Sequence, residues 1–125
     1  MQTLVLDANF LMSAYKFRVD AISELKGLVV GKFRLVAPSS VLGELELISR
    51  TRGAAGPQAK YALEVMRKEG VTVMRTKQKA DEWIEDFCSS TGAIACTNDS
   101  DLRKKLKEKG VRCILLKGKS KLDYA

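Results

Sequence analysis

The feature that most constrains the fold is an alternation of short apolar runs with longer segments of helical periodicity. Runs that are apolar throughout are typical of strands buried on both faces of a sheet, and they lie at residues 3–6, around Val36, and at residues 71–74, 94–96 and 113–116. Between them lie helical patterns at residues 10–17, 21–30, 40–50, 57–68, 80–90 and 98–109. Strands that alternate with helices predict right-handed βαβ units, and therefore an α/β fold with a parallel sheet covered by helices on both sides.

The size of the chain predicts one domain. Its 125 residues, of which 46% are hydrophobic, are enough for a substantial core but not for a second domain of ordinary size. We expect the domain to span residues 1–117 and to be followed by a solvated basic tail at residues 118–125. There is no signal sequence, and no apolar run approaches the ~18 residues that cross a bilayer. We therefore expect a cytoplasmic protein with no membrane partner.

Four acidic residues stand where a strand or a helix can direct them toward one point. Asp7 directly follows the first predicted strand, and Asp99 follows the strand at residues 94–96. Ligands of an open parallel sheet bind beyond the carboxyl ends of its strands, so both acids stand at one rim if their strands are neighbours. Glu44 and Asp81 each share a helix surface with apolar side chains, as expected at the rim of a site. Taken singly, the first two acids also fit helix caps and the other two fit solvated helix faces.

The chain contains no histidine, and its three cysteines, Cys88, Cys96 and Cys113, have no C-x-x-C spacing. The cysteines lie in apolar stretches and are expected to be buried free thiols. Without histidine, the general base of Ser-His-Asp and Cys-His sites is absent. Carboxylates are the ligands that Mg²⁺ and Mn²⁺ prefer. The acids therefore predict a Mg²⁺ or Mn²⁺ site and, in a hydrolase, metal-bound water as the nucleophile.

Four short motifs, in order along the chain, resemble those of the PIN-domain ribonuclease family. Residues 6–11 (LDANFL) look like the family's D-x-N/S/T opening, and residues 95–102 (ACTNDSDL) look like its late T-x-D-x-x-L signature. Between them, residues 38–45 (PSSVLGEL) and 80–84 (ADEWI) resemble the helices that carry its second and third acids. Residues 10–20 and 97–102 look closest to archaeal PIN proteins similar to the PIN nuclease of the eukaryotic small-subunit processome, which acts on pre-ribosomal RNA.

The resemblance implies a three-layer α/β/α fold with a five-stranded parallel sheet, a Mg²⁺ or Mn²⁺ site and endonuclease activity on single-stranded RNA. It assigns the catalytic and metal-binding roles to Asp7, Glu44, Asp81 and Asp99. Asn9 and Thr97 match polar positions that support the pocket, and Asp101 matches either an accessory metal-binding acid or a helix-start residue. PIN relatives often pair, so we expect a homodimer in which the helices at residues 40–50 and 57–68 supply an exposed apolar stripe.

The net charge of +7 favours a polyanionic partner. Basic side chains that follow the acidic motifs can contact RNA phosphates without reading the base sequence. We expect this role for Lys16, Arg18, Arg50, Arg52, Arg103 and Lys104.

The sequence leaves three biological roles open. Processing of ribosomal RNA implies ribosomal RNA and a ribosome-assembly protein as partners. A toxin-like PIN ribonuclease of the VapC type implies a small antitoxin that holds the enzyme inactive. The third role, a PIN fold that binds RNA or protein without cutting, is disfavoured by the intact set of acids. A phospho-receiver domain does not fit, because the strand at residues 71–74 ends without a phosphate-accepting Asp.

Overall fold

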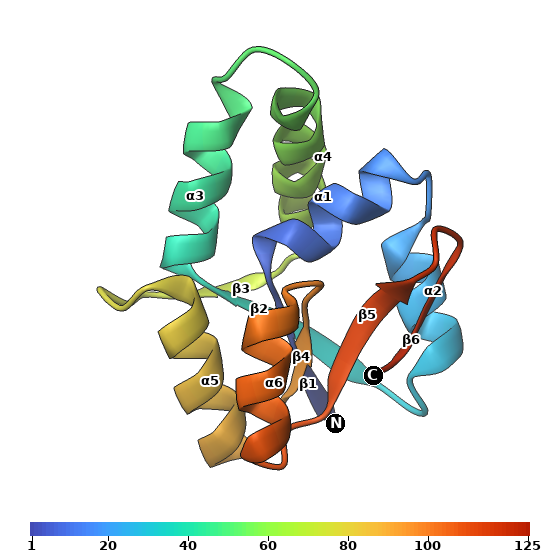
Figure 1. Cartoon of the computed structure of the whole chain (residues 1–125), viewed down its shortest axis with the longest axis vertical. Helices are drawn as coiled ribbons and strands as arrows, with labels where there is room; N and C mark the ends of the chain where they lie inside the picture. The colour runs from blue at the N-terminus through green and yellow to red at the C-terminus, as the bar shows by residue number, and fades with distance from the viewer.

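A six-stranded sheet with the order β3-β2-β1-β4-β5-β6 runs through the centre of the computed structural model, which describes residues 1–125 (Figure 1). Strands β1 to β5 are parallel, and β6 pairs with β5 in the antiparallel direction. The expected five-stranded parallel sheet is therefore confirmed, with one strand added at its edge. The strands are β1 (Gln2–Leu6), β2 (Phe33–Pro38), β3 (Thr72–Met74), β4 (Ile94–Cys96), β5 (Cys113–Lys117) and β6 (Lys121–Tyr124).

The additional strand lies in the segment that we expected to be a solvated basic tail, residues 118–125. Leu122 of β6 is only 5% exposed and belongs to the hydrophobic core. Its amide donates a hydrogen bond to the Glu24 carboxylate at 3.3 Å. Residues 121–124 alternate charged and apolar side chains, which suits a strand with one buried face, but the short run and the nearby Lys119 and Lys121 obscured this pattern in the sequence.

Helices cover both faces of the sheet, as the alternating pattern predicted. They are α1 (Ala8–Lys16), α2 (Ala21–Leu28), α3 (Ser39–Ser49), α4 (Ala55–Lys68), α5 (Ala80–Thr91) and α6 (Ser100–Glu108). Side chains from α1 to α4 form one core on one face, and α5 and α6 form a second core on the other. Strand β1 contributes to both, because Leu4 and Leu6 point into the first core and Val5 into the second. No helix is both long enough and apolar enough to cross a membrane.

Strand β3 departs from the expectation that the apolar runs are buried on both faces. Val73 and Met74 are 39% and 37% exposed. The strand is short and pairs only with β2, so its other edge has no neighbour. The three cysteines, by contrast, are free and buried as predicted. Burial raises the pKa of the Cys88 thiol to about 12, so this thiol is protonated at neutral pH.

The strand order reverses between β1 and β4. The chain proceeds from β1 to β2 and β3 on one side, and then returns to place β4 and β5 on the other side. Leu6 of β1 is in register with Cys96 of β4, and the Asp7 amide donates to the Cys96 carbonyl at 3.0 Å. The residues that follow β1 and β4 therefore emerge side by side at the topological switch point, where open α/β sheets bind ligands.

Candidate active site

Asp7 is the most firmly held of the four acids. It is 7% exposed and lies at the end of β1, where it caps the N-terminus of α1. Its Oδ1 accepts a hydrogen bond from the Ala8 amide at 2.9 Å, and its Oδ2 accepts from Thr97 Oγ1 at 2.7 Å and from Asn9 Nδ2 at 3.1 Å. Burial raises the pKa of Asp7 most, and the Asp99 charge adds to this, while these hydrogen bonds oppose the shift.

Asn9 and Thr97 lie where the resemblance placed them, in contact with Asp7. Thr97 is fully buried, and its Oγ1 accepts a hydrogen bond from the Asp99 amide at 3.1 Å while it donates to Asp7. The Oδ1 atom of Asn9 accepts from the Asn98 amide at 2.8 Å. The two side chains therefore join the end of β1 to the end of β4.

Asn98 extends this network and was missed as a site residue. Its Oδ1 accepts a hydrogen bond from the Leu116 amide of β5 at 3.1 Å. The helical pattern predicted from residue 98 begins two residues later in the structure, where Asp99 caps α6. The available signal was a polar amide directly after a buried strand, next to the Thr and Asp of the late motif.

Asp99 is exposed at the start of α6. Its Oδ1 accepts hydrogen bonds from the amides of Asp101 and Leu102 at 3.0 and 3.2 Å, as a helix cap does. Its second oxygen makes no hydrogen bond to the protein and stays available to a ligand. Asp101 lies in the first turn of α6, and its side chain is exposed, which is compatible with both of the roles that the resemblance offers.

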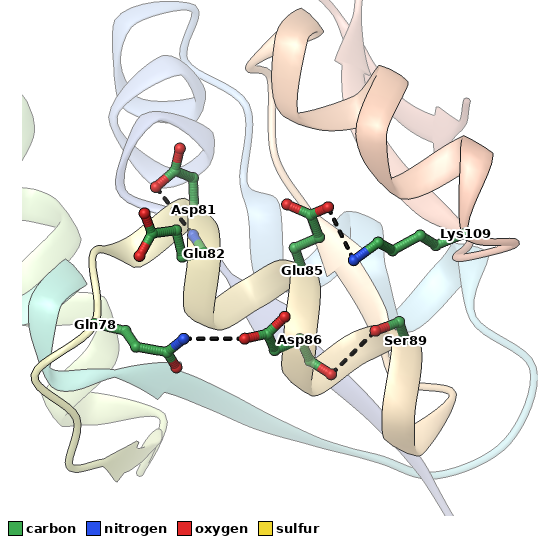
Figure 2. Close-up of polar contacts among 7 residues, drawn as sticks. All are labelled: Gln78, Asp81, Glu82, Glu85, Asp86, Ser89 and Lys109. Atoms are coloured by element: carbon green, nitrogen blue, oxygen red, sulfur yellow. Dashed lines mark hydrogen bonds and ion pairs between the residues drawn. The ribbon is translucent and has the colours of Figure 1, made fainter.

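Glu44 and Asp81 approach from helices. Glu44 lies on α3, largely exposed and without a hydrogen bond to the protein. Partial burial raises its pKa, and the negative charges of Asp7 and Asp81 raise it further. Asp81 lies in the first turn of α5, and its Oδ1 accepts from the Glu82 amide at 2.9 Å (Figure 2). Within this set, the Asp99 charge acts on Asp7, and the charges of Asp7 and Asp81 act on Glu44.

The other acids of α5 are engaged elsewhere (Figure 2). Glu85 forms an ion pair with Lys109 at 3.1 Å and links α5 to the end of α6. Asp86 accepts a hydrogen bond from Gln78 Nε2 at 2.9 Å. Glu82 remains exposed beside Asp81 and is therefore the better matched control for substitutions in the acidic site.

The donor chemistry of the four acids fits a hard divalent cation. None of the four forms an ion pair with a lysine or arginine, since the three ion pairs of the structure lie elsewhere. As placed, no three His, Cys, Asp or Glu side chains form a group that could hold a metal ion. Carboxylates repel one another at close range, and Glu44 and Asp81 have exposed side chains that can change rotamer. The acids thus supply oxygen ligands without a closed coordination shell.

The six basic residues expected to contact RNA lie in two regions. Lys16 and Arg18 border a cavity of about 610 Å³ that the beginning of α4 also lines, and Arg50 and Arg52 stand in the exposed loop before α4. This region lies at the far end of α1 from Asp7, about 12 Å along a helix of nine residues. The second region contains Arg103 and Lys104 on α6, within one to two turns of Asp99.

The fold and the site define an α/β domain with an acidic site at the switch point of a parallel sheet. Residues 4–119 match the family described as PIN like domain. The chain is 31% identical over 108 residues to Ribonuclease VapC9 of Archaeoglobus fulgidus, covering 86% of this chain and 77% of that protein. It is 28% identical over 123 residues to Ribonuclease VapC4 of Methanocaldococcus jannaschii, covering 95% and 93%. This chain belongs to the PIN-like domain family.

A solved structure shows the same fold. The PIN domain endonuclease Utp24 superposes with a TM-score of 0.81 at 19% sequence identity, covering 98% of this chain and 90% of that chain. At this identity the likeness concerns the architecture.

Proposed function

We propose that this protein is a metal-dependent endoribonuclease that hydrolyses phosphodiester bonds of single-stranded RNA in the cytoplasm. The observation that carries the proposal is the position of Asp7 and Asp99 at the switch point of a PIN-like domain, where Thr97 hydrogen-bonds to both. Relatives named as ribonucleases at 31% and 28% identity support the same reaction class.

Asp7, Glu44, Asp81 and Asp99 are the residues that we assign to the metal, with Asp101 as an accessory ligand. A Mg²⁺ or Mn²⁺ ion held there would supply an activated water molecule and neutralise charge on the scissile phosphate. The carboxylate of Asp7 is the most rigidly held of the proposed ligands, because Thr97, Asn9 and the α1 backbone donate hydrogen bonds to both of its oxygens. Glu44 accepts no hydrogen bond from the protein and has a raised pKa, so its exposed carboxylate is free to turn toward the metal or to take up a proton.

The proposal is tested by incubating the protein with structured and unstructured RNA, with and without Mn²⁺. We expect cleavage of the unstructured RNA only when Mn²⁺ is present. The Asp7→Asn variant should bind RNA and leave it intact. RNA that stays intact with wild-type protein and Mn²⁺ would favour the third role, a PIN module that binds without cutting.

The identities favour a VapC-type ribonuclease over a nuclease of ribosomal RNA processing, because both curated relatives carry that name. The VapC-type role predicts that expression in a bacterial host stops growth and that Asp7→Asn restores it. It also predicts a small antitoxin as partner. If growth continues at high expression while ribosomal RNA precursors are cut, the processing role and a ribosome-assembly partner are favoured instead.

We also propose a homodimer. Leu47 of α3 is 67% exposed and Tyr15 of α1 is 44% exposed, so large apolar side chains face solvent on the side formed by α1, α3 and α4. Light scattering over a dilution series tests the dimer. A monomer at high micromolar concentration would contradict it.

A further inference from the structure

A groove of about 670 Å³ lies between α6 and the strands β5 and β6. Ser100, Arg103, Lys104 and Lys107 line one wall, and their spacing places them along one flank of α6. The rest of its lining comes from Val111, Arg112, Cys113, Tyr124 and Ala125. Two helices cover this face of the sheet, whereas four cover the other, so the sheet beside α6 is left open (Figure 1).

The groove is strongly basic, and its charges are not neutralised by the protein. No Asp or Glu side chain lines it, and none of Arg103, Lys104, Lys107 and Arg112 forms an ion pair. Lysines just outside it are paired, since Lys109 contacts Glu85 and Lys117 contacts Asp123. Arg112 is held in place by a hydrogen bond to Gln2 Oε1 at 3.2 Å.

The groove begins at the acidic site. Ser100 at its upper end directly follows Asp99, the acid that caps α6. From Ser100 to Lys107 the helix rises about 10 Å. A strand with a phosphate near the acidic site can thus continue along the basic flank of α6.

We propose that this groove is the track along which the RNA backbone leaves the cleavage site. Arg103, Lys104 and Lys107 contact successive phosphates of the strand on one side of the scissile bond, and Arg112 adds a fourth positive charge to the groove. This assignment rests on the proposed ribonuclease function. Val111, which packs against the core on the α6 side of the sheet, adds an apolar contact in the groove. The groove lies next to the acidic site, and this position favours RNA over an acidic protein as its occupant.

The test removes the three α6 charges together, as R103Q/K104Q/K107Q. Binding of a fluorescent single-stranded RNA is measured by anisotropy over a salt series in an Asp7→Asn background, which prevents cleavage. Each phosphate contact to single-stranded RNA contributes about 0.7 to the slope of log K against log salt. We expect the slope to fall in magnitude by about 2 and the affinity at low salt to fall by more than 10-fold. Thermal melting verifies that the variant is folded.

The matched control removes three exposed lysines from the opposite face of the sheet, as K26Q/K60Q/K68Q, and should leave the slope near the wild-type value. An unchanged slope in the α6 variant, or an equal loss in the control, would overturn the track. So would binding of poly-glutamate in preference to RNA. The proposed function is judged separately by cleavage with the unmodified protein. If that protein cuts RNA while the α6 variant binds like wild type, only the track is wrong, and a loss of slope without any cleavage would support the track alone.

Discussion

The acidic site has two halves that are built differently. Asp7 and Asp99 follow strands β1 and β4, cap helices and accept hydrogen bonds that fix their carboxylates. Glu44 and Asp81 stand on α3 and α5, are exposed, and accept between them one hydrogen bond from the protein. The strand-end half is therefore preorganised, while the helical half keeps its rotamer freedom.

This difference shows how a fold can position metal ligands accurately although their negative charges repel one another. Four fixed carboxylates at close range would destabilise the metal-free protein. Holding one pair on the sheet edge and leaving the other pair on exposed helix surfaces lets the charges separate in the absence of a cation. We expect the strand-end half to determine where a metal ion binds and the helical half to complete its ligands.

The largest effect expected from this comparison is the loss of cleavage in Asp7→Asn. Substitution of residues that merely orient metal ligands typically costs 10- to 100-fold, so removal of the central ligand should reduce the cleavage rate by at least about 100-fold. Glu44→Gln, in the helical half, should cost less. The rates are compared on one RNA at saturating Mn²⁺, with Glu82→Gln as the control expected to match wild type. Equal activity of Asp7→Asn and wild type would refute the metal-nuclease assignment.

The second effect concerns Thr97, which orients Asp7 without being a ligand in our assignment. Thr97→Val removes the hydroxyl that donates to Asp7 and accepts from the Asp99 amide. We expect cleavage to fall by about 10- to 100-fold, with a higher Mn²⁺ requirement and a stability loss of about 1–3 kcal/mol from the unpaired buried groups. Thr97→Ser keeps the hydroxyl and should restore the Mn²⁺ requirement. If Thr97→Val were destabilised with an unchanged Mn²⁺ requirement, Thr97 would have only a structural role.

A third prediction compares the two halves through metal binding. An ion that binds only the folded state at 100 times its dissociation constant stabilises it by about 2.7 kcal/mol. Mn²⁺ should therefore raise the melting temperature of wild type, and Asp7→Asn should lose most of this gain while Glu44→Gln loses part of it. Calorimetric melts with Mn²⁺ and with a chelator measure the rise in melting temperature for wild type and for each variant. An equal loss in the two variants would remove the proposed asymmetry between the halves.

Local patterns in the sequence predicted most of the fold and the location of the acids. The five parallel strands and six helices begin and end within a few residues of their predicted bounds, because apolar runs and helical periodicity depend on neighbours along the chain. Strand β6 was missed because charged residues interrupt the apolar pattern of its sequence, and because its pairing with β5 is a tertiary contact. Pairings across the fold were also invisible, since the contacts of Asn98 with β5 and of Glu85 with Lys109 depend on how distant elements pack.

The smallest predicted effect is a pH dependence of the metal-free protein, and it again separates the two halves. The pKa of Asp7 is raised from an ordinary value of 3.8, chiefly by burial, and that of Glu44 from 4.5, also chiefly by burial. A carboxyl group with a raised folded-state pKa favours the folded state when it is protonated. Its contribution is fully present below the unfolded-state pKa and is lost as pH rises through the folded-state pKa. Stability in the presence of a chelator should therefore decline as pH rises above about 4.

Asp7→Asn should flatten that decline more than Glu44→Gln does, because Asp7 is buried whereas Glu44 is largely exposed and screened by solvent. Denaturant melts at intervals between pH 4 and pH 7 measure the slope, and Glu82→Gln serves as the exposed control. Saturating Mn²⁺ should remove the decline in wild type, since a bound cation favours the ionised carboxylates. If Glu44→Gln flattened the profile as much as Asp7→Asn, the helical half would be as constrained as the strand-end half, and the contrast between them would fail.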